Sequence, residues 1–266
     1  MIDLAQAFWL ALLQGITEFL PVSSSGHLVL LPQLLHWPDQ GLAFDVAVHV
    51  GTLLAVLLYF RQDIRLILGD WMRSLIGGPT THYSRLAWAI AWATVMVGVA
   101  GILLESLINQ WLRSPIPVAL ATIGFAILLG WADRAGKRAR NLDDINWRDI
   151  LAIGAAQVLA LIPGTSRSGI TITTGLAMGL TREAAARFSF LMAIPVIALA
   201  GAWQTRSLLA SEAPVAWSVL LFGTLVSGVV AFACIHWFLG YLRHFSMMPF
   251  VIYRIVLGII LLVVFL

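Results

Sequence analysis

The apolar residues of this chain are gathered in long blocks. Six of these blocks run for roughly 17 to 25 residues, the length that an α-helix needs to cross the hydrocarbon core of a bilayer. They lie near residues 44–60, 86–108, 116–132, 187–203, 215–238 and 249–266. The pattern therefore predicts an all-α integral membrane protein with six transmembrane helices.

Two further apolar stretches, residues 4–35 and 149–180, are interrupted in the middle by proline, glycine and clustered hydroxyl residues. Lipid cannot satisfy free backbone N–H and C=O groups, so irregular backbone at membrane depth occurs only where protein or a water-filled cavity surrounds it. Neither stretch fits a single transmembrane helix. We predict that each forms a re-entrant helix pair.

The two interrupted stretches also resemble each other. Identical residues align at Gln14 and Gln157, Ser23 and Ser166, Ser25 and Ser168, and Gly26 and Gly169. Each stretch is followed by three predicted spans, and an odd number of crossings reverses the orientation of the second copy. This predicts an inverted repeat with a site at the repeat interface. The predicted halves are residues 1–132 and 149–266, joined by a cytoplasmic loop, 133–148.

Composition and charge support a membrane protein. Hydrophobic residues make up 60% of the chain and charged residues only 11%, too few to cover a water-soluble globule. The formal net charge is +3, but the basic residues lie in short loops, where they set membrane topology. We therefore expect no nucleic-acid partner.

The placement of these basic residues predicts the orientation, because cytoplasmic loops collect Lys and Arg. If both long loops are cytoplasmic, the inner side holds Arg61, Arg65, Arg73, Arg85, Arg134, Lys137, Arg138, Arg140, Arg148, Arg182, Arg187 and Arg243. The outer side then holds Arg113 and Arg206. Both termini and the opening of the first helix pair are predicted to face outward, while the second pair enters from the inner face.

Four ionisable residues at membrane depth stand out, because such groups are costly in a bilayer and usually mark function. They are Glu18 and His27 in QGITEFLPVSSSGH, Arg167 in PGTSRSGIT and Arg254 in PFVIYRIVLG. Asp45 and His49 also share one helical face, near the end of a span where solvent reaches Asp45.

Each interrupted stretch contains a turn that is suited to an anion. In the first, Gln14 and Glu18 share one face of a helix that Pro21 ends, and a run of serines follows. Unpaired amides at the start of the next helix favour negative charge. The second turn, around Gly164, repeats this design and adds the guanidinium of Arg167.

If the two turns meet, their side chains form a phosphate site. Arginine is a bidentate partner of phosphate, a serine beside a histidine can act as a nucleophile with its base, and a carboxylate can hold a divalent cation. Hydroxyl groups in membrane helices also serve as packing groups, and Arg254 can instead anchor near the headgroups. The predicted set is Glu18, Ser24, His27 and Arg167, with Ser23, Ser25, Gly164, Ser166, Ser168, Thr171 and Arg254 as binding residues.

The segments QGITEFLPVSSSGH and PGTSRSGIT resemble the two signature regions of the bacterial undecaprenyl pyrophosphate phosphatases, the bacitracin-resistance family. Similar stretches are AVHVGTLLAVLLYFR, NLDDINWRD, ARFSFLMAIP and PFVIYRI, so the resemblance runs nearly end to end. The family has Glu or Gln at the start of the first motif and Glu four residues later, which Gln14 and Glu18 match.

This resemblance implies hydrolysis of undecaprenyl pyrophosphate to undecaprenyl phosphate and inorganic phosphate. It implies a divalent cation, Mg²⁺ or Ca²⁺, with Glu18 as a metal ligand or catalytic carboxylate and Gln14 as a second metal ligand that lacks the charge of a glutamate. It also implies a site at the periplasmic face of the bacterial inner membrane, in an enzyme that is often a homodimer among membrane lipids. It also implies Ser24 as nucleophile, His27 as its general base or acid, and Arg167, with Ser166 and Thr171, as the phosphate clamp. A metal-held water remains the alternative nucleophile.

Two other functions compete with this one. Inverted repeats with broken helices also build transporters, so a polyprenyl-phosphate transporter or flippase is the main alternative. The string Ser-Gly-His is also found in type 2 phosphatidic acid phosphatases. That family needs a later Arg and a His followed by Asp after a Ser-Arg motif, and no such set follows Arg167.

Overall fold

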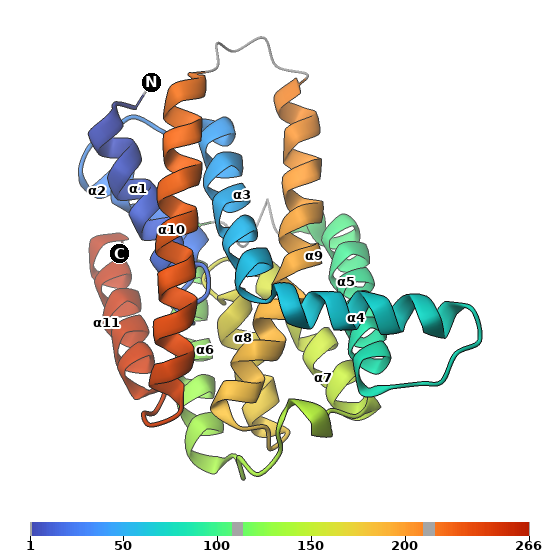
Figure 1. Ribbon diagram of the computed structural model, residues 1–266. Helices are drawn as coiled ribbons and strands as arrows, with labels where there is room; N and C mark the ends of the chain where they lie inside the picture. Colours follow the sequence, from blue (N-terminus) through green and yellow to red (C-terminus); the bar gives the residue numbers. More distant parts are fainter. Residues whose placement is uncertain (1, 108–113, 210–215, 266) are drawn as a thin grey trace.

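The computed structural model describes residues 2–107, 114–209 and 216–265, which fold almost entirely into helices (Figure 1). The α-helices are α1 (Leu4–Thr17), α2 (Ser24–Leu34), α3 (Gly41–Tyr59), α4 (Arg61–Leu75), α5 (His82–Leu107), α6 (Pro115–Ala135), α7 (Trp147–Val158), α8 (Arg167–Ala177), α9 (Arg182–Leu209), α10 (Trp217–Leu242) and α11 (Met248–Phe265). Two short 3-10 helices, η2 (Leu142–Asp144) and η3 (Leu159–Leu161), join them.

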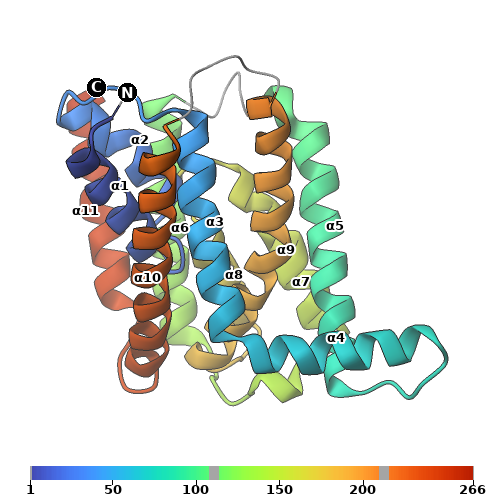
Figure 2. The ribbon, with the colours of Figure 1, turned by 45° about the horizontal axis from the view of Figure 1, so that its top comes forward.

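Within the described residues, six helices are long and apolar enough to cross a membrane. They are α3, α5, α6, α9, α10 and α11, which confirms the six predicted spans with ends displaced by a few residues. The protein is therefore a multi-pass membrane protein. Figure 2 shows both chain termini at the same end of this bundle.

The two interrupted stretches form helical hairpins. A capping box between Asp3 and Gln6 starts α1, and the chain turns back into α2. In the second hairpin, Asn146 caps α7, and the chain turns back into α8 through η3. The tips touch, because the hydroxyl of Ser168 donates to the carbonyl of Leu20 at 2.8 Å. The re-entrant placement and the inverted repeat stay predictions.

Helix α4 has no counterpart among the predicted elements, since the sequence analysis treats its residues as part of a cytoplasmic loop. It lies across the direction of the spans (Figure 2). Its apolar face, which includes Ile64, Ile67 and Trp71, contacts the cluster of buried residues between the spans. Arg65 and Arg73 occupy the exposed face. Leu66, Leu68 and Met72 are also exposed, but charged residues separate the apolar ones, so the helix is amphipathic rather than uniformly apolar.

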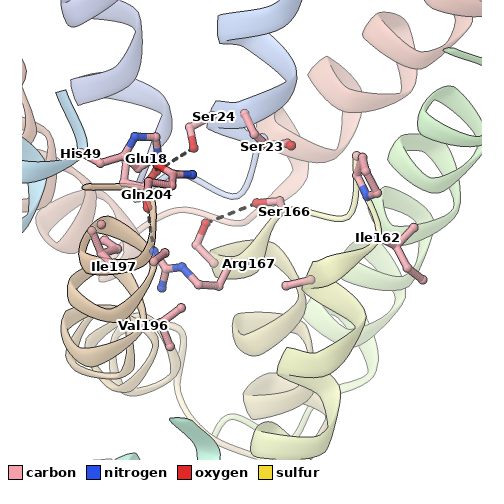
Figure 3. Close-up of a pocket in the computed structure, with 17 residues that line it drawn as sticks. Glu18, Ser23, Ser24, His49, Ile162, Ser166, Arg167, Val196, Ile197 and Gln204 are labelled. Carbon is pink, nitrogen blue, oxygen red and sulfur yellow. Dashed lines mark hydrogen bonds and ion pairs between the residues drawn. The ribbon is translucent and has the colours of Figure 1, made fainter. Parts of the chain in front are cut away.

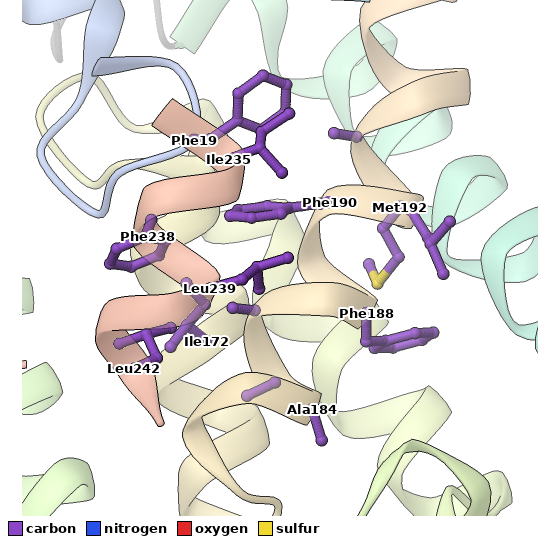
Figure 4. Close-up of a cluster of buried hydrophobic side chains, with 14 of the residues drawn as sticks. Phe19, Ile172, Ala184, Phe188, Phe190, Met192, Ile235, Phe238, Leu239 and Leu242 are labelled. Atoms are coloured by element: carbon purple, nitrogen blue, oxygen red, sulfur yellow. The ribbon is translucent and has the colours of Figure 1, made fainter. Parts of the chain in front are cut away.

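Aromatic packing holds the tip of the first hairpin against the spans (Figure 4). The ring of Phe19 meets Phe190 of α9 edge to face, with centroids 5.1 Å apart. Phe190 in turn lies 6.1 Å from Phe238 of α10. All three residues are fully buried. Such edge-to-face pairs favour one relative orientation of the rings, so the cluster fixes where the hairpin tip lies.

Ion pairs join the segments at the end of the bundle opposite the termini. Asp133 accepts from Arg182 at 2.5 Å and from the backbone N–H of Met247 at 3.0 Å. Asp149 accepts from both terminal nitrogens of Arg140, and this hydrogen bonding raises the pKa of the Arg140 guanidinium. Arg140 and Arg182 are among the basic residues that the sequence analysis assigns to the cytoplasmic side, and this orientation stays a prediction. Arg113 lies outside the described residues.

Candidate active site

A pocket of about 200 Å³ lies between the two hairpin tips and the apolar side of α9 (Figure 3). Its polar wall is formed by Glu18, Ser23, Ser24, Ser25, His49, Ser166, Arg167 and Ser168. Its apolar wall includes Val196, Ile197 and Ala200 of α9, and Gln204 lies at the same side. The pocket thus brings the two sequence motifs together, as the sequence analysis predicts.

The Glu18 carboxylate is the centre of this polar wall. One oxygen accepts from the Ser24 hydroxyl at 2.6 Å and from the Gln14 amide nitrogen at 3.0 Å. The other oxygen accepts from Arg167 at 3.1 Å. Only 8% of Glu18 is exposed, and a carboxylate buried to this extent needs a partner charge and hydrogen bonds. Arg167 supplies the charge, and Ser24 and Gln14 supply the hydrogen bonds.

Arg167 crosses from one hairpin to the other. It is the first residue of α8, where the positive end of the helix dipole adds to its own charge. Its guanidinium donates to Glu18 and, at 3.4 Å, to the carbonyl of Ser189. A guanidinium carries five N–H donors, so these contacts leave donors for an anion in the pocket. The arrangement favours a phosphate group beside Arg167.

Each hairpin tip places a serine in a strained backbone conformation. Ser23 has φ = 73° and Ser166 has φ = 69°, in the left-handed region that residues other than glycine rarely adopt. Each serine directly precedes a helix that starts at the pocket. Strain of this kind is concentrated at functional sites, where the surroundings hold the residue in place. Here it aims two helix N-termini at one cavity.

The hydrogen bonds of His27 go to groups other than the Ser24 hydroxyl. Its Nδ1 lies 2.7 Å from the carbonyl oxygen of Ser23, and its Nε2 hydrogen-bonds the hydroxyl of Tyr253. The His27 and Tyr253 rings are stacked, with centroids 5.7 Å apart. One ring nitrogen of His27 is therefore bonded to the backbone of the hairpin turn, and the other is bonded to a side chain of α11. The partner of the Ser24 hydroxyl is Glu18, not the histidine that the sequence analysis assigns to it.

Three other predicted binding residues have different partners from those expected. Thr171 lies outside the pocket, where its hydroxyl meets that of Ser189 at 2.7 Å. Ser168 lines the pocket, but its hydroxyl donates to the hairpin backbone. Gly164 also lines the pocket and has φ = 91°; an added Cβ would lie 2.4 Å from the carbonyl oxygen of Val118. Gly164 thus serves the fold of the tip.

Arg254 is fully buried and lies outside the pocket. Its guanidinium donates to the carbonyl oxygens of Pro21, Gly164 and Thr165, at 3.4, 2.9 and 2.8 Å. These carbonyls belong to both hairpin tips. The sequence analysis predicts that Arg254 binds substrate. In the structure it instead joins the two hairpin tips to α11.

His49 of α3 lines the pocket, although the sequence analysis does not include it in the site. Its Nε2 lies 3.8 Å from a carboxylate oxygen of Glu18, and its Nδ1 lies 2.7 Å from the carbonyl oxygen of Asp45. The sequence signal was the helical spacing of Asp45 and His49. The side chain of Asp45 accepts from Gln40 instead, so the spacing marked the right helical face but the wrong partner.

Comparison with known proteins identifies the family of this site. The family model described as "bacitracin resistance protein BacA" matches residues 7–260. The chain belongs to this family. Undecaprenyl-diphosphatase of Nitrosococcus oceani is 55% identical over 263 residues, 99% of both chains. Proteins of the same name from Thioalkalivibrio sulfidiphilus and Chromohalobacter salexigens are 54% and 55% identical, over 99% and 96% of both chains.

The BacA-family site has oxygen atoms that fit a divalent cation only in part. Among the residues that the structure describes, no three His, Cys, Asp or Glu side chains cluster as a metal site. Glu18 offers one carboxylate, and the amide oxygen of Gln14 is buried with no partner in the described part of the chain. Mg²⁺ is often held by one or two carboxylates together with substrate phosphates. The residues therefore fit a cation that the substrate helps to hold.

Proposed function

We propose that this protein hydrolyses undecaprenyl pyrophosphate to undecaprenyl phosphate and inorganic phosphate, and so recycles the lipid carrier of bacterial cell-wall synthesis. The relatives that match along nearly the whole chain carry the name undecaprenyl-diphosphatase. The observation that carries the proposal is the pocket in which Arg167, Glu18 and the Ser24 hydroxyl meet.

In the proposed reaction the terminal phosphate lies between the two helix N-termini, against Arg167. The Ser24 oxygen attacks the terminal phosphorus, and the bond from that phosphorus to the bridging oxygen breaks. Glu18, which accepts the Ser24 hydrogen bond at 2.6 Å, takes the proton. Undecaprenyl phosphate leaves with the bridging oxygen. In the second step the oxygen of a water molecule bonds to the phosphorus as the bond from phosphorus to the Ser24 oxygen breaks. Glu18 returns its proton to Ser24, and inorganic phosphate leaves with the hydrogens of the water.

Electrostatic stabilisation contributes most of the catalysis in phosphoryl transfer, since the transferred group carries spread negative charge. Arg167 and the N-terminal amides of α2 and α8 supply fixed positive charge on this side of the pocket. A divalent cation, Mg²⁺ or Ca²⁺, bound by Glu18 and Gln14 would add charge neutralisation on the pyrophosphate. A water held beside Glu18 is the alternative nucleophile and uses the same residues.

The proposed location is the bacterial inner membrane, with the pocket open toward the periplasm. Gln204 of the pocket lies two residues from Arg206, near the end of α9 that we predict to face outward from the distribution of basic residues. This position allows the pyrophosphate to enter from the outer surface while the polyprenyl tail stays in the hydrocarbon. A polyprenyl-phosphate transporter built on the same motifs is the alternative function.

The decisive experiment measures inorganic phosphate released from undecaprenyl pyrophosphate by the purified protein in detergent, with and without EDTA. Detergent removes the second compartment that a transporter needs. We expect release that EDTA suppresses and that Ser24→Ala and Arg167→Ala each lower by roughly 10² or more. Ser74→Ala and Arg73→Ala, on helix α4 and outside the pocket, are matched controls that should keep full activity. A folded protein that releases no phosphate would contradict the proposed function.

A further inference from the structure

A second cavity, of about 510 Å³, adjoins the phosphate pocket. The two share Ser25, Ala160, Pro163 and Gly164 in their walls, so the second cavity begins where the first ends. An apolar cavity between α3 and α10 and another beneath α4 share no lining residue with the pocket. We call the adjoining cavity the α2–α6–α11 groove.

Apolar side chains from both halves of the chain line this groove. Val29 and Leu30 come from α2, Val118 from α6, and Leu261 and Phe265 from α11. Figure 2 shows α2 and the end of α11 close together at the end of the bundle that carries the termini. Val29 is 57% exposed and Phe265 is 40% exposed on surfaces that would face the bilayer. The groove thus leads from the pocket edge to the lipid.

We propose that the α2–α6–α11 groove holds the first isoprene units of the substrate's polyprenyl chain. The inference rests on the proposed function, which places the pyrophosphate in the adjoining pocket. The chain is covalently joined to that pyrophosphate and must leave the pocket through an apolar opening. The groove meets the pocket at a shared wall in which Ala160, Pro163 and Gly164 are apolar, so it is the apolar space nearest to the pyrophosphate. The groove volume lies within the roughly 300–1,000 Å³ that is usual for ligand sites.

We expect the groove to orient the substrate rather than to raise its binding affinity. Lipid tails are as apolar as the leucine side chains of the groove, so moving isoprene units from bilayer to groove changes the free energy little. A held chain fixes the direction of the bridging oxygen relative to Ser24. In-line attack depends on that direction, and a small misplacement of reacting atoms slows the reaction strongly. A blocked groove should therefore impair long substrates selectively.

The first test fills the groove with a tryptophan, in the variant Leu30→Trp. We expect kcat/KM for undecaprenyl pyrophosphate to fall about tenfold or more, with little change for isopentenyl pyrophosphate, which lacks the long chain. The matched control is Leu225→Trp in the α3–α10 cavity, of about 480 Å³, and it should leave both values unchanged. Equal losses for both substrates in Leu30→Trp, or no loss for either, would overturn the proposal.

A second test needs no turnover. A polyprenyl phosphate with a diazirine in its first isoprene units is photolysed with the protein, and the labelled peptides are identified by mass spectrometry. We expect labels in residues 29–33 and 261–265 that excess undecaprenyl phosphate displaces and Leu30→Trp reduces. Labels on α3 and α10, or labels that are not displaced, would overturn the groove. Displaceable labels there in a protein that releases no phosphate would support the groove and refute only the proposed hydrolysis.

Discussion

The two hairpins have the same backbone plan but carry opposite chemistry. Each tip holds a serine in the left-handed region directly before a helix, Ser23 in one and Ser166 in the other. The next residue is a hydroxyl in the first copy, Ser24, and a cation in the second, Arg167. A phosphate site needs both a nucleophile with its base and fixed positive charge. Neither hairpin supplies both, so the site exists only where the tips meet.

The two glutamines that align between the hairpins, Gln14 and Gln157, have different partners. Gln14 donates to the Glu18 carboxylate at 3.0 Å, whereas Gln157 donates to the backbone carbonyl of Ala93 in α5 at 3.3 Å. The position that aligns with Glu18 is Leu161, which cannot accept a proton. The first glutamine therefore bonds the carboxylate in the pocket, and the second bonds the backbone of a neighbouring helix. The predictions below test this division of roles.

The largest expected effect comes from removing the cation of the second hairpin. Arg167→Ala should lower kcat/KM for undecaprenyl pyrophosphate by roughly 10² to 10³, because fixed charge stabilises the transferring group. Arg167→Lys should recover part of the loss, since it keeps the charge but lacks the planar fork. Phosphate-release kinetics measure both values.

The control for this prediction is the double variant Glu18→Gln with Arg167→Ala. Residues that act as a unit are not additive, so the double variant should be no slower than the slower single variant. Fully additive losses would mean that the two side chains act separately, and the idea of one site shared between hairpins would be wrong.

The second largest effect should appear in stability. Arg254→Met leaves the carbonyl oxygens of Pro21 and Thr165, one in each tip, without the donor that Arg254 supplies, and buried polar groups that lose a partner cost about 1–3 kcal/mol each. We expect a clearly lower thermal unfolding midpoint in detergent, with Arg254→Lys in between. A variant with unchanged stability but a raised KM would instead show that Arg254 binds substrate.

A smaller effect is expected at the histidine of the first hairpin. Tyr253→Phe removes one hydrogen bond to His27, worth about 0.5–1.5 kcal/mol, so kcat should fall roughly two- to tenfold if the histidine orientation matters. Tyr241→Phe, whose hydroxyl donates to Ser246 at the other end of the bundle, is the matched control. Equal rates in both variants would mean that Tyr253 does not serve the site.

The smallest effect is expected when each of the two strained serines is replaced by glycine and the unfolding midpoints are compared. Glycine relieves a left-handed backbone by about 1 kcal/mol. Ser23 makes no capping hydrogen bond, but the Ser166 hydroxyl accepts from the backbone N–H of Gly169 at 3.2 Å. Ser23→Gly should therefore raise the unfolding midpoint more than Ser166→Gly does. The reverse order would show that the Ser23 hydroxyl stabilises its own tip.

The sequence by itself determined the membrane spans, the two interrupted stretches and the pairing of their motifs. These features depend on local patterns: a span needs about 20 apolar residues in a row, and broken backbone needs proline, glycine and hydroxyl residues close together. The sequence analysis did not predict the amphipathic helix α4, because its apolar residues are separated by polar residues rather than contiguous.

Only the tertiary structure decided which partners the reactive groups have. Ser24 and His27 are neighbours in sequence, yet Ser24 meets Glu18, and His27 meets a tyrosine from α11. His49 reaches the pocket from α3, and Arg254 ties the tips from α11. Hydrogen bonds between distant segments depend on how whole helices pack, and the pattern of apolar and polar positions along one helix does not specify the side chains that face it.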